Sequence, residues 1–140
     1  MSELTNFENR IMKMLLDGDH PLLENLRHQF EQCRVSSRKF TGVGFFTDFE
    51  VDARLAYGKI NLELSDIHIN NVVGIRYGIG IVLFIREGVL SFLEGYTYDP
   101  ESYPENISQY DLSYLWKENP QFRNERDWDG LFESLKKKSV

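Results

Sequence analysis

The side chains best suited to recognising another molecule lie in one stretch of the sequence. Residues 87–116 contain six acidic residues and no lysine or arginine, together with five tyrosines and one tryptophan. Tyrosine and tryptophan are enriched at the energetic centres of protein interfaces, and carboxylates steer cationic partners toward a surface. We predict a partner-binding surface made of Glu94, Tyr96, Tyr98, Asp99, Glu101, Tyr103, Glu105 and Asp111. The alternative is a solvated loop whose tyrosines pack the core.

Three acidic residues could bind a metal ion. Asp48, Glu50 and Asp52 alternate along an expected strand, so their side chains share one face. Hard cations bind clustered carboxylates, but the sequence has no calcium-loop pattern, and a solvated strand face is the expected role. The three histidines are scattered, with no HxH or HExxH motif. We therefore expect no metal site and no cofactor.

The sequence contains no motif for catalysis. The glycine-rich string at 73–80 is not GxGxxG, and a strand rather than a helix follows it. No serine lies in a GxSxG elbow, and Cys33 lies on an apolar helical stripe, where cysteine acts as a small hydrophobe. No catalytic residue is assigned, and a non-enzymatic protein is favoured.

Charge and composition exclude several classes of protein. The net charge of -6 and the pI near 5.1 argue against a general binder of nucleic acid or anionic membranes. One cysteine excludes an internal disulfide. The polar N-terminus has no signal-peptide pattern, and no run approaches the roughly 18 apolar residues of a membrane span. We expect a cytoplasmic protein with a single domain over residues 1–140.

Two helices are predicted at the start of the chain. Thr5 and Glu8 have the spacing of a capping box, and apolar residues follow at helical spacing up to Gly18. A second helix begins around Pro21 and continues one apolar stripe to residues 36–37. A last helix begins at about Asp127.

Between the helices the period changes to two. We predict strands over 40–51 and 59–67, a turn at 70–71, a short strand or connector at 72–77, and a loop over 99–106. Residues 107–116 alternate like a strand, although a short helix is also possible. This order predicts an α+β fold with a mostly antiparallel sheet of five or six strands. The two N-terminal helices and the C-terminal helix pack on that sheet.

The clearest element is a β-hairpin over residues 79–98. Two apolar runs flank Glu87-Gly88, which predicts a two-residue turn. A regular ladder from this turn pairs Ile81 with Glu94 and Gly80 with Gly95. Both faces of the hairpin are largely apolar, which predicts cover on both sides.

Glu94 interrupts an apolar face in that register. A buried, unpaired carboxylate is costly, so either the strand leaves the core there or the carboxylate lies in a pocket. In the first case the Glu94 carboxylate is solvated, or it is paired with Arg76 or Arg86. In the second, Glu94 shares the pocket with Tyr96 and Tyr98.

Three strings within residues 38–104 carry a family resemblance. They are Thr41-Gly42-Val43-Gly44-Phe45-Phe46-Thr47, Gly78-x-Gly80-x-x-Leu83-Phe84 and Leu93-Glu94-Gly95-Tyr96-Thr97-Tyr98. Together they resemble a family of short uncharacterised bacterial proteins, of which the last string is the most specific part. The family has no established activity, so the resemblance assigns no functional residues. In size, charge and architecture the chain is also similar to immunity proteins of bacterial toxin systems.

These observations give three hypotheses about function. The first is a non-enzymatic binding module of immunity type, whose acidic, tyrosine-rich surface covers the basic face of a toxin-like protein. The second is a small-molecule binder or enzyme with a pocket near Glu94, Tyr96 and Tyr98. The third is a structural or self-associating domain, because exposed aromatic residues make a homodimer possible.

Overall fold

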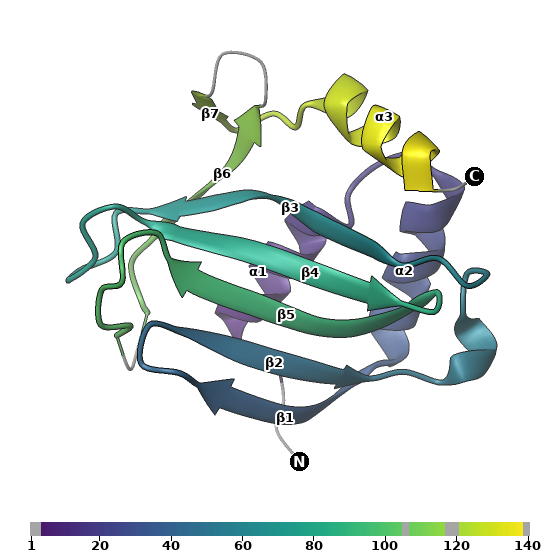
Figure 1. Cartoon of the computed structure of the whole chain (residues 1–140), viewed down its shortest axis with the longest axis horizontal. Coiled ribbons are helices and arrows are strands. Elements are labelled where there is room, and N and C mark those ends of the chain that lie inside the picture. The colour runs from purple at the N-terminus through teal and green to yellow at the C-terminus, as the bar shows by residue number, and fades with distance from the viewer. Residues whose placement is uncertain (1–3, 105–106, 117–120, 139–140) are drawn as a thin grey trace.

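The computed structural model describes residues 4–104, 107–116 and 121–138. It shows an α+β fold in which a seven-stranded antiparallel sheet is accompanied by three helices (Figure 1). The α+β prediction is confirmed, but the expected five or six strands become seven. The elements are α1 (Asn6–Leu15), α2 (Pro21–Gln32), β1 (Arg34–Phe40), β2 (Gly44–Glu50), a 3-10 turn (Ala53–Leu55), β3 (Leu62–Asn70), β4 (Ile79–Arg86), β5 (Val89–Thr97), β6 (Asp111–Trp116), β7 (Gln121–Arg123) and α3 (Trp128–Lys138).

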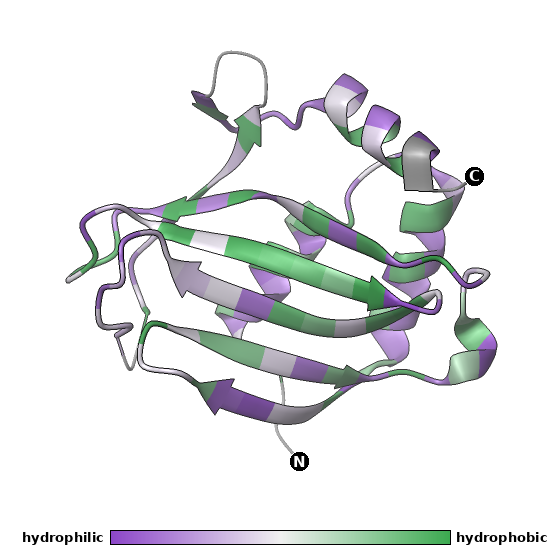
Figure 2. Cartoon of the chain, viewed as in Figure 1, coloured by the Kyte–Doolittle hydropathy of each residue, from purple (hydrophilic) through white to green (hydrophobic). Residues whose placement is uncertain are grey.

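The sheet is covered by helices on one face. Its strand order is β1-β2-β5-β4-β3-β6-β7, and α1 and α2 lie behind the central strands in Figure 1. Helix α3 packs beside the connection between α1 and α2, where His20 stacks on Phe132 with 5.8 Å between ring centroids. Strand β4, at the centre, is apolar from Ile81 to Ile85 (Figure 2). The prediction of cover on both faces is wrong for the described residues, since none of their helices crosses the front face.

Helix α1 begins with the predicted capping box. The Thr5 hydroxyl accepts the Glu8 N–H at 3.1 Å, and the Glu8 carboxylate accepts the Thr5 N–H at 2.8 Å. The same buried carboxylate accepts two bonds from Arg38, at 3.0 and 2.6 Å, and one from the Thr47 hydroxyl at 2.6 Å. Burial alone would raise the pKa of Glu8, but these hydrogen bonds outweigh it and lower the pKa. Glu8 thereby joins α1 to β1 and β2.

The segment after α2 differs from the prediction. The helix ends at Gln32 rather than at residues 36–37, and Arg34–Phe40 forms β1, paired with β2. The buried β-branched Val35 packs in the core from a strand, so tertiary pairing overrides the helical stripe. The predicted strand over 40–51 is interrupted by a turn, which uses the positive φ of Gly42 (90°).

The remaining strands are mostly as expected. β3 extends past its predicted end at residue 67 to Asn70, and Asn71 makes the predicted turn with a φ of 56°. Residues 72–77 form turns, and residues 111–116 form β6, which confirms a strand in the ambiguous stretch. The short strand β7 was not predicted, and α3 begins one residue after the expected start.

The β4–β5 hairpin has the predicted turn but a different register. Glu87 and Gly88 both have positive φ, 51° and 78°, as a two-residue hairpin turn requires. A bulge then places one extra residue, Ser91, in β5, because Ile85 pairs with Leu90 while residue 84 pairs with residue 92. Beyond the bulge the predicted pairing is wrong by one residue. Side chains alternate with a period of two, so the shift moves every later side chain of β5 to the opposite face.

The buried side chain of Gln29 supports this bulge. Its Oε1 accepts the Leu90 N–H at 2.9 Å, and its Nε2 donates to the Gly88 carbonyl at 2.9 Å. The amide also donates to Asn25 at 2.7 Å and to the Leu55 carbonyl at 3.3 Å. One glutamine of α2 therefore satisfies the backbone that the irregular ladder leaves unpaired.

Arg126 is the largest fully buried side chain and connects three parts of the fold. Its guanidinium binds the Asp66 carboxylate of β3 at 2.8 and 2.9 Å. Its Nη1 donates to the carbonyls of Met14, Leu15 and Asp17 at 3.1, 2.9 and 2.8 Å. These carbonyls lie at the end of α1, where intrahelical donors run out, and that of Met14 also accepts the Tyr114 hydroxyl at 2.7 Å. The cation also complements the negative end of the helix dipole.

We expect Gln29→Leu to destabilise the protein by about 1–3 kcal/mol, because the buried Leu90 N–H loses its acceptor. Urea unfolding measures the change. Gln32→Leu is the matched control, since Gln32 is an exposed residue of the same helix. Equal midpoints for the two variants would show that Gln29 does not support the bulge.

We expect Arg126→Met to lower the free energy of unfolding by about 3–5 kcal/mol, because Asp66 and three carbonyls lose one buried cation. Arg54→Met is the control, since Arg54 makes an exposed ion pair with Asp52 and should change the thermal midpoint little. The role assigned to Arg126 is wrong if its variant unfolds at the same temperature as the control.

Candidate binding surface on the open face of the sheet

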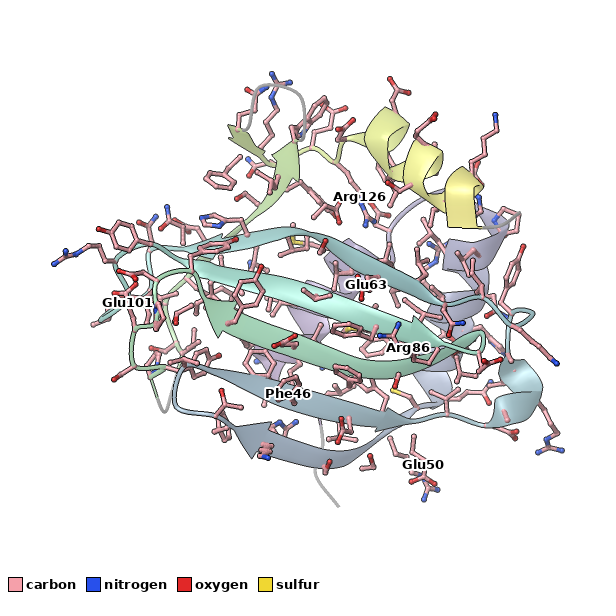
Figure 3. All side chains as sticks on the ribbon, in the orientation of Figure 1. Phe46, Glu50, Glu63, Arg86, Glu101 and Arg126 are labelled. Carbon is pink, nitrogen blue, oxygen red and sulfur yellow. The ribbon has the colours of Figure 1, made fainter. Side chains whose placement is uncertain are left out.

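The face of the sheet turned away from α1 and α2 carries half-buried aromatic side chains. We call it the open face, and it faces the viewer in Figure 3, where Phe46 of β2 is labelled. The bulge at Ser91 places the later side chains of β5 on this face. Its central residues are Phe46, Val82, Phe84, Phe92, Glu94 and Tyr96.

Glu94 lies in the middle of the open face. Its neighbours across the ladders are Val82 of β4 and Phe46 of β2, both half-buried. The carboxylate makes no hydrogen bond or ion pair within the described part of the chain. Desolvation by the surrounding side chains raises the pKa of Glu94 above its ordinary value. It is therefore neither fully solvated nor buried in the core.

Neither arginine considered as a partner for Glu94 is paired with it. The Arg86 guanidinium lies 3.9 Å from the Glu63 carboxylate and 4.9 Å from the centre of the Phe84 ring. Figure 3 labels this pair on neighbouring strands. Arg76 lies over the ring of Tyr77, at 5.9 Å.

Two groups of aromatic rings flank Glu94. On one side Phe84 stacks on Phe92 with 4.2 Å between centroids, and Phe46 lies 5.8 Å from Phe92. On the other side Tyr96 meets Tyr98 edge to face at 5.6 Å. A desolvated carboxylate between aromatic rings can bind a cation through both charge and the ring faces.

Two glycines, Gly80 of β4 and Gly78 just before it, let Tyr96 and His68 lie close to the sheet. A Cβ atom on Gly80 would lie 2.5 Å from Cζ of Tyr96, so the Tyr96 ring fills the space above Gly80. A Cβ on Gly78 would lie 2.6 Å from Cε1 of His68. These two glycines provide close packing of rings, and Gly80 pairs with Tyr96 rather than with Gly95.

His68 is a site residue that the sequence analysis did not assign. It is 3% exposed, and its Nδ1 lies 3.0 Å from the hydroxyl of Tyr98. Its ring lies between Phe122 of β7 and Tyr98, at 3.8 and 5.4 Å. Burial lowers the pKa of His68 and raises the pKa of Tyr98 to about 12. The alternation of Ile67, His68 and Ile69 could have identified this residue. It places the two isoleucines on the core face of the strand and the histidine on the other face.

The other predicted residues lie in different surroundings. The β3–β6 register puts Asp111 on the same side of the sheet as His68, at the end of β3. Tyr103 lies on the helix side, against Phe45 at 5.6 Å. Burial raises the pKa of Tyr103. Asp111 accepts a hydrogen bond from the Asn71 side chain at the end of β3, and Asp99 is exposed. Glu105 lies outside the described residues.

Glu101 binds the chain's own backbone. Its two carboxylate oxygens accept the N–H groups of Arg76 and Tyr77 at 2.8 and 3.2 Å. Figure 3 places Glu101 at the end of the sheet, beside the loop between β3 and β4. Of the eight predicted residues, the structure therefore brings together Glu94, Tyr96 and Tyr98.

Several cavities lie elsewhere. One, of about 160 Å³, is lined by residues that include Glu8, Arg38, Phe45 and Tyr103. Another, of about 150 Å³, lies between β3 and α3, and two larger ones, of about 560 and 510 Å³, lie against α1. The walls of all four are made without Glu94, Tyr96 or Tyr98, so the small-molecule pocket stays a prediction. Among the described residues, no group of three histidine, cysteine, aspartate or glutamate side chains could hold a metal ion.

No family model, curated protein or solved structure matches this chain. The resemblance to a bacterial family stays a prediction. None of the described helices has both the length and the apolar content to cross a membrane.

We expect Glu101→Ala to release the loop between β3 and β4 without unfolding the sheet. The Arg76 and Tyr77 amides lose their acceptor, so their hydrogen exchange should be roughly fivefold faster. This factor corresponds to a loss of about 1 kcal/mol of local stability, allowing for solvent screening of the carboxylate. Asp99→Ala is the control, because Asp99 is exposed and makes no hydrogen bond within the described residues. Unchanged exchange at both amides in Glu101→Ala would contradict the loop contact.

Proposed function

We propose that this protein is a cytoplasmic, bacterial, non-enzymatic binding module that holds a basic protein on the open face of its sheet. The observation that carries the proposal is the partly desolvated, unpaired carboxylate of Glu94 among half-buried aromatic rings and the exposed ring of Tyr98. A cationic side chain of a partner would supply the missing counter-charge, and the rings would supply contact area.

The distribution of charge supports a basic partner. Residues 87–116 carry six acidic residues and no lysine or arginine, and the whole chain has a net charge of -6. Tyr98 and Phe122 add exposed aromatic surface beside His68, with 43% and 53% of their surfaces accessible. A negative field raises the rate of association with a positive partner and makes that rate sensitive to salt.

Charge disfavours a second copy of the chain as the occupant. A two-fold interface places the same patch on both subunits. Glu94 of one copy would then meet another acidic surface on a chain that also carries a net charge of -6. Like charges across an interface are unfavourable, so a basic protein fits this face better than a homodimer does.

An immunity-type role fits this chemistry. An immunity protein covers the functional surface of a toxin, and a toxin that acts on an anionic substrate has a basic surface there. Size, charge and architecture support this form of the proposal, as does the absence of a catalytic motif from the sequence. A toxin gene directly upstream in the host genome would support it further.

We expect Glu94→Lys to abolish capture of a basic protein from the native host, because the substitution reverses the one central charge. Tagged wild type, Glu94→Lys and Glu31→Lys are compared, and retained proteins are identified by mass spectrometry. Glu31→Lys makes the same charge change on an exposed position of α2, on the covered side of the sheet. Light scattering of each variant reports self-association.

The captured protein is then purified and its association rate is measured at increasing salt. The proposal requires a partner with net positive charge, retention by wild type and Glu31→Lys, and a rate that falls as salt rises. Equal retention by Glu94→Lys, a rate independent of salt, or a stable homodimer dissociated by Glu94→Lys would each refute it.

A further inference from the structure

The carboxylates on the open face differ in their partners. Asp48 accepts a hydrogen bond from the Ser37 hydroxyl at 2.5 Å, and Glu63 lies 3.9 Å from the Arg86 guanidinium. Glu94 has neither kind of partner within the described residues. Its two cross-strand neighbours, Phe46 and Val82, are apolar, so neither side chain offers the carboxylate a hydrogen bond.

Tyr96 places a large π surface beside this carboxylate. It lies two residues from Glu94 on β5, so both side chains leave the strand on the same face. Its ring occupies the space above Gly80, and Tyr98 stands against it with an interplanar angle of 88°. The Tyr96 ring is thereby held on two sides and keeps a half-exposed surface.

This pairing of groups suits a guanidinium better than an ammonium. A guanidinium is planar, donates two parallel hydrogen bonds to one carboxylate and stacks on aromatic rings. A guanidinium is also more weakly hydrated, so it loses less hydration free energy when it binds to a partly apolar surface. A lysine ammonium is a compact, strongly hydrated charge with no planar face to lie on a ring.

We propose that Glu94 and Tyr96 form the binding site for a single arginine side chain of the partner. The backbone of Gly80 lies beneath the tyrosine ring. The proposal rests on the proposed function, because it names the group by which the basic partner is recognised. The guanidinium donates to the Glu94 carboxylate, and Val82 and Phe46 flank its aliphatic stem. Arginine is among the residues most enriched at interface hot spots, which fits a central position.

The experiment uses the full chain, labelled with ¹⁵N, and three small probes that differ only in the side-chain head group. They are the Nα-acetyl N-methylamides of arginine, lysine and citrulline, the last being a neutral isostere of arginine. We expect saturable shifts of the Gly80, Glu94 and Tyr96 amide signals with the arginine probe. The lysine probe should bind several-fold more weakly, and the citrulline probe should cause no saturable shift at these amides.

Two variants test the two contacts separately. Glu94→Gln keeps the size of the side chain and should weaken the arginine probe about tenfold, which corresponds to ~1.4 kcal/mol. Tyr96→Leu removes the ring and should reduce the preference for arginine over lysine. Glu31→Gln changes the net charge as Glu94→Gln does, on the exposed side of α2, and should leave the affinity unchanged. Unchanged signals elsewhere in the spectrum show that each variant is folded.

The inference is overturned if citrulline binds as well as arginine, if lysine binds equally, if Glu94→Gln keeps full affinity, or if no probe gives saturable shifts. These results are separable from the fate of the proposed function. If a basic partner is captured through Glu94 but the arginine probe does not bind, only the arginine-binding site is refuted. Loss of both capture and probe binding would remove both proposals.

Discussion

The extra residue in β5 decides which way the central hairpin faces. Without Ser91 in the bulge, the ladder predicted from the turn would point Phe92, Glu94 and Tyr96 at the helices. With it, Leu93 enters the core, and the carboxylate and the rings face solvent. Because the period of a strand is two, one residue changes the environment of the whole second half of the strand. The open face therefore depends on a local irregularity that α2 stabilises through Gln29.

The two ends of α1 are fixed in complementary ways. At the start, the Glu8 carboxylate accepts the Thr5 N–H and binds Arg38 of β1. At the end, Arg126 binds the last carbonyls and Asp66 of β3. Both sets of contacts place an opposite charge at the pole of the helix dipole that it stabilises. The helix that covers the sheet is thus held to both halves of it by buried, hydrogen-bonded charges, rather than by apolar packing alone.

Local signals in the sequence predicted the elements that local chemistry controls. The capping box at Thr5, the turn at Glu87-Gly88 and the turn at Asn71 are all confirmed, because each depends on residues within one turn of the chain. The first strand was missed because its pairing with β2 prevails over a helical stripe that continues past Gln32. Such competition between local preference and distant pairing is invisible in a single sequence.

The candidate surface was only partly predicted, because it too depends on contacts between residues far apart in the sequence. Glu94, Tyr96 and Tyr98 were identified from composition, but their placement was argued from a regular ladder. The signal for the bulge was a glutamine within the apolar part of α2, and its partners lie 59 and 61 residues away. Phe122 joins the surface only because β6 and β7 extend the sheet beyond β3, and its ring then covers His68. Tyr103 carried the same compositional signal and lies on the covered side, since the loop after β5 crosses the edge of the sheet.

The position of Arg126 in the chain has a consequence for synthesis on the ribosome. Helix α1 emerges first, yet the cation that completes its C-terminal end is encoded 111 residues after Leu15. Until that arginine leaves the exit tunnel, the last carbonyls of α1 and the Asp66 carboxylate have no shared cation, although every strand of the sheet has already been made. A chain that ended just before Arg126 would therefore contain every strand of the sheet and lack the cation that binds the end of α1.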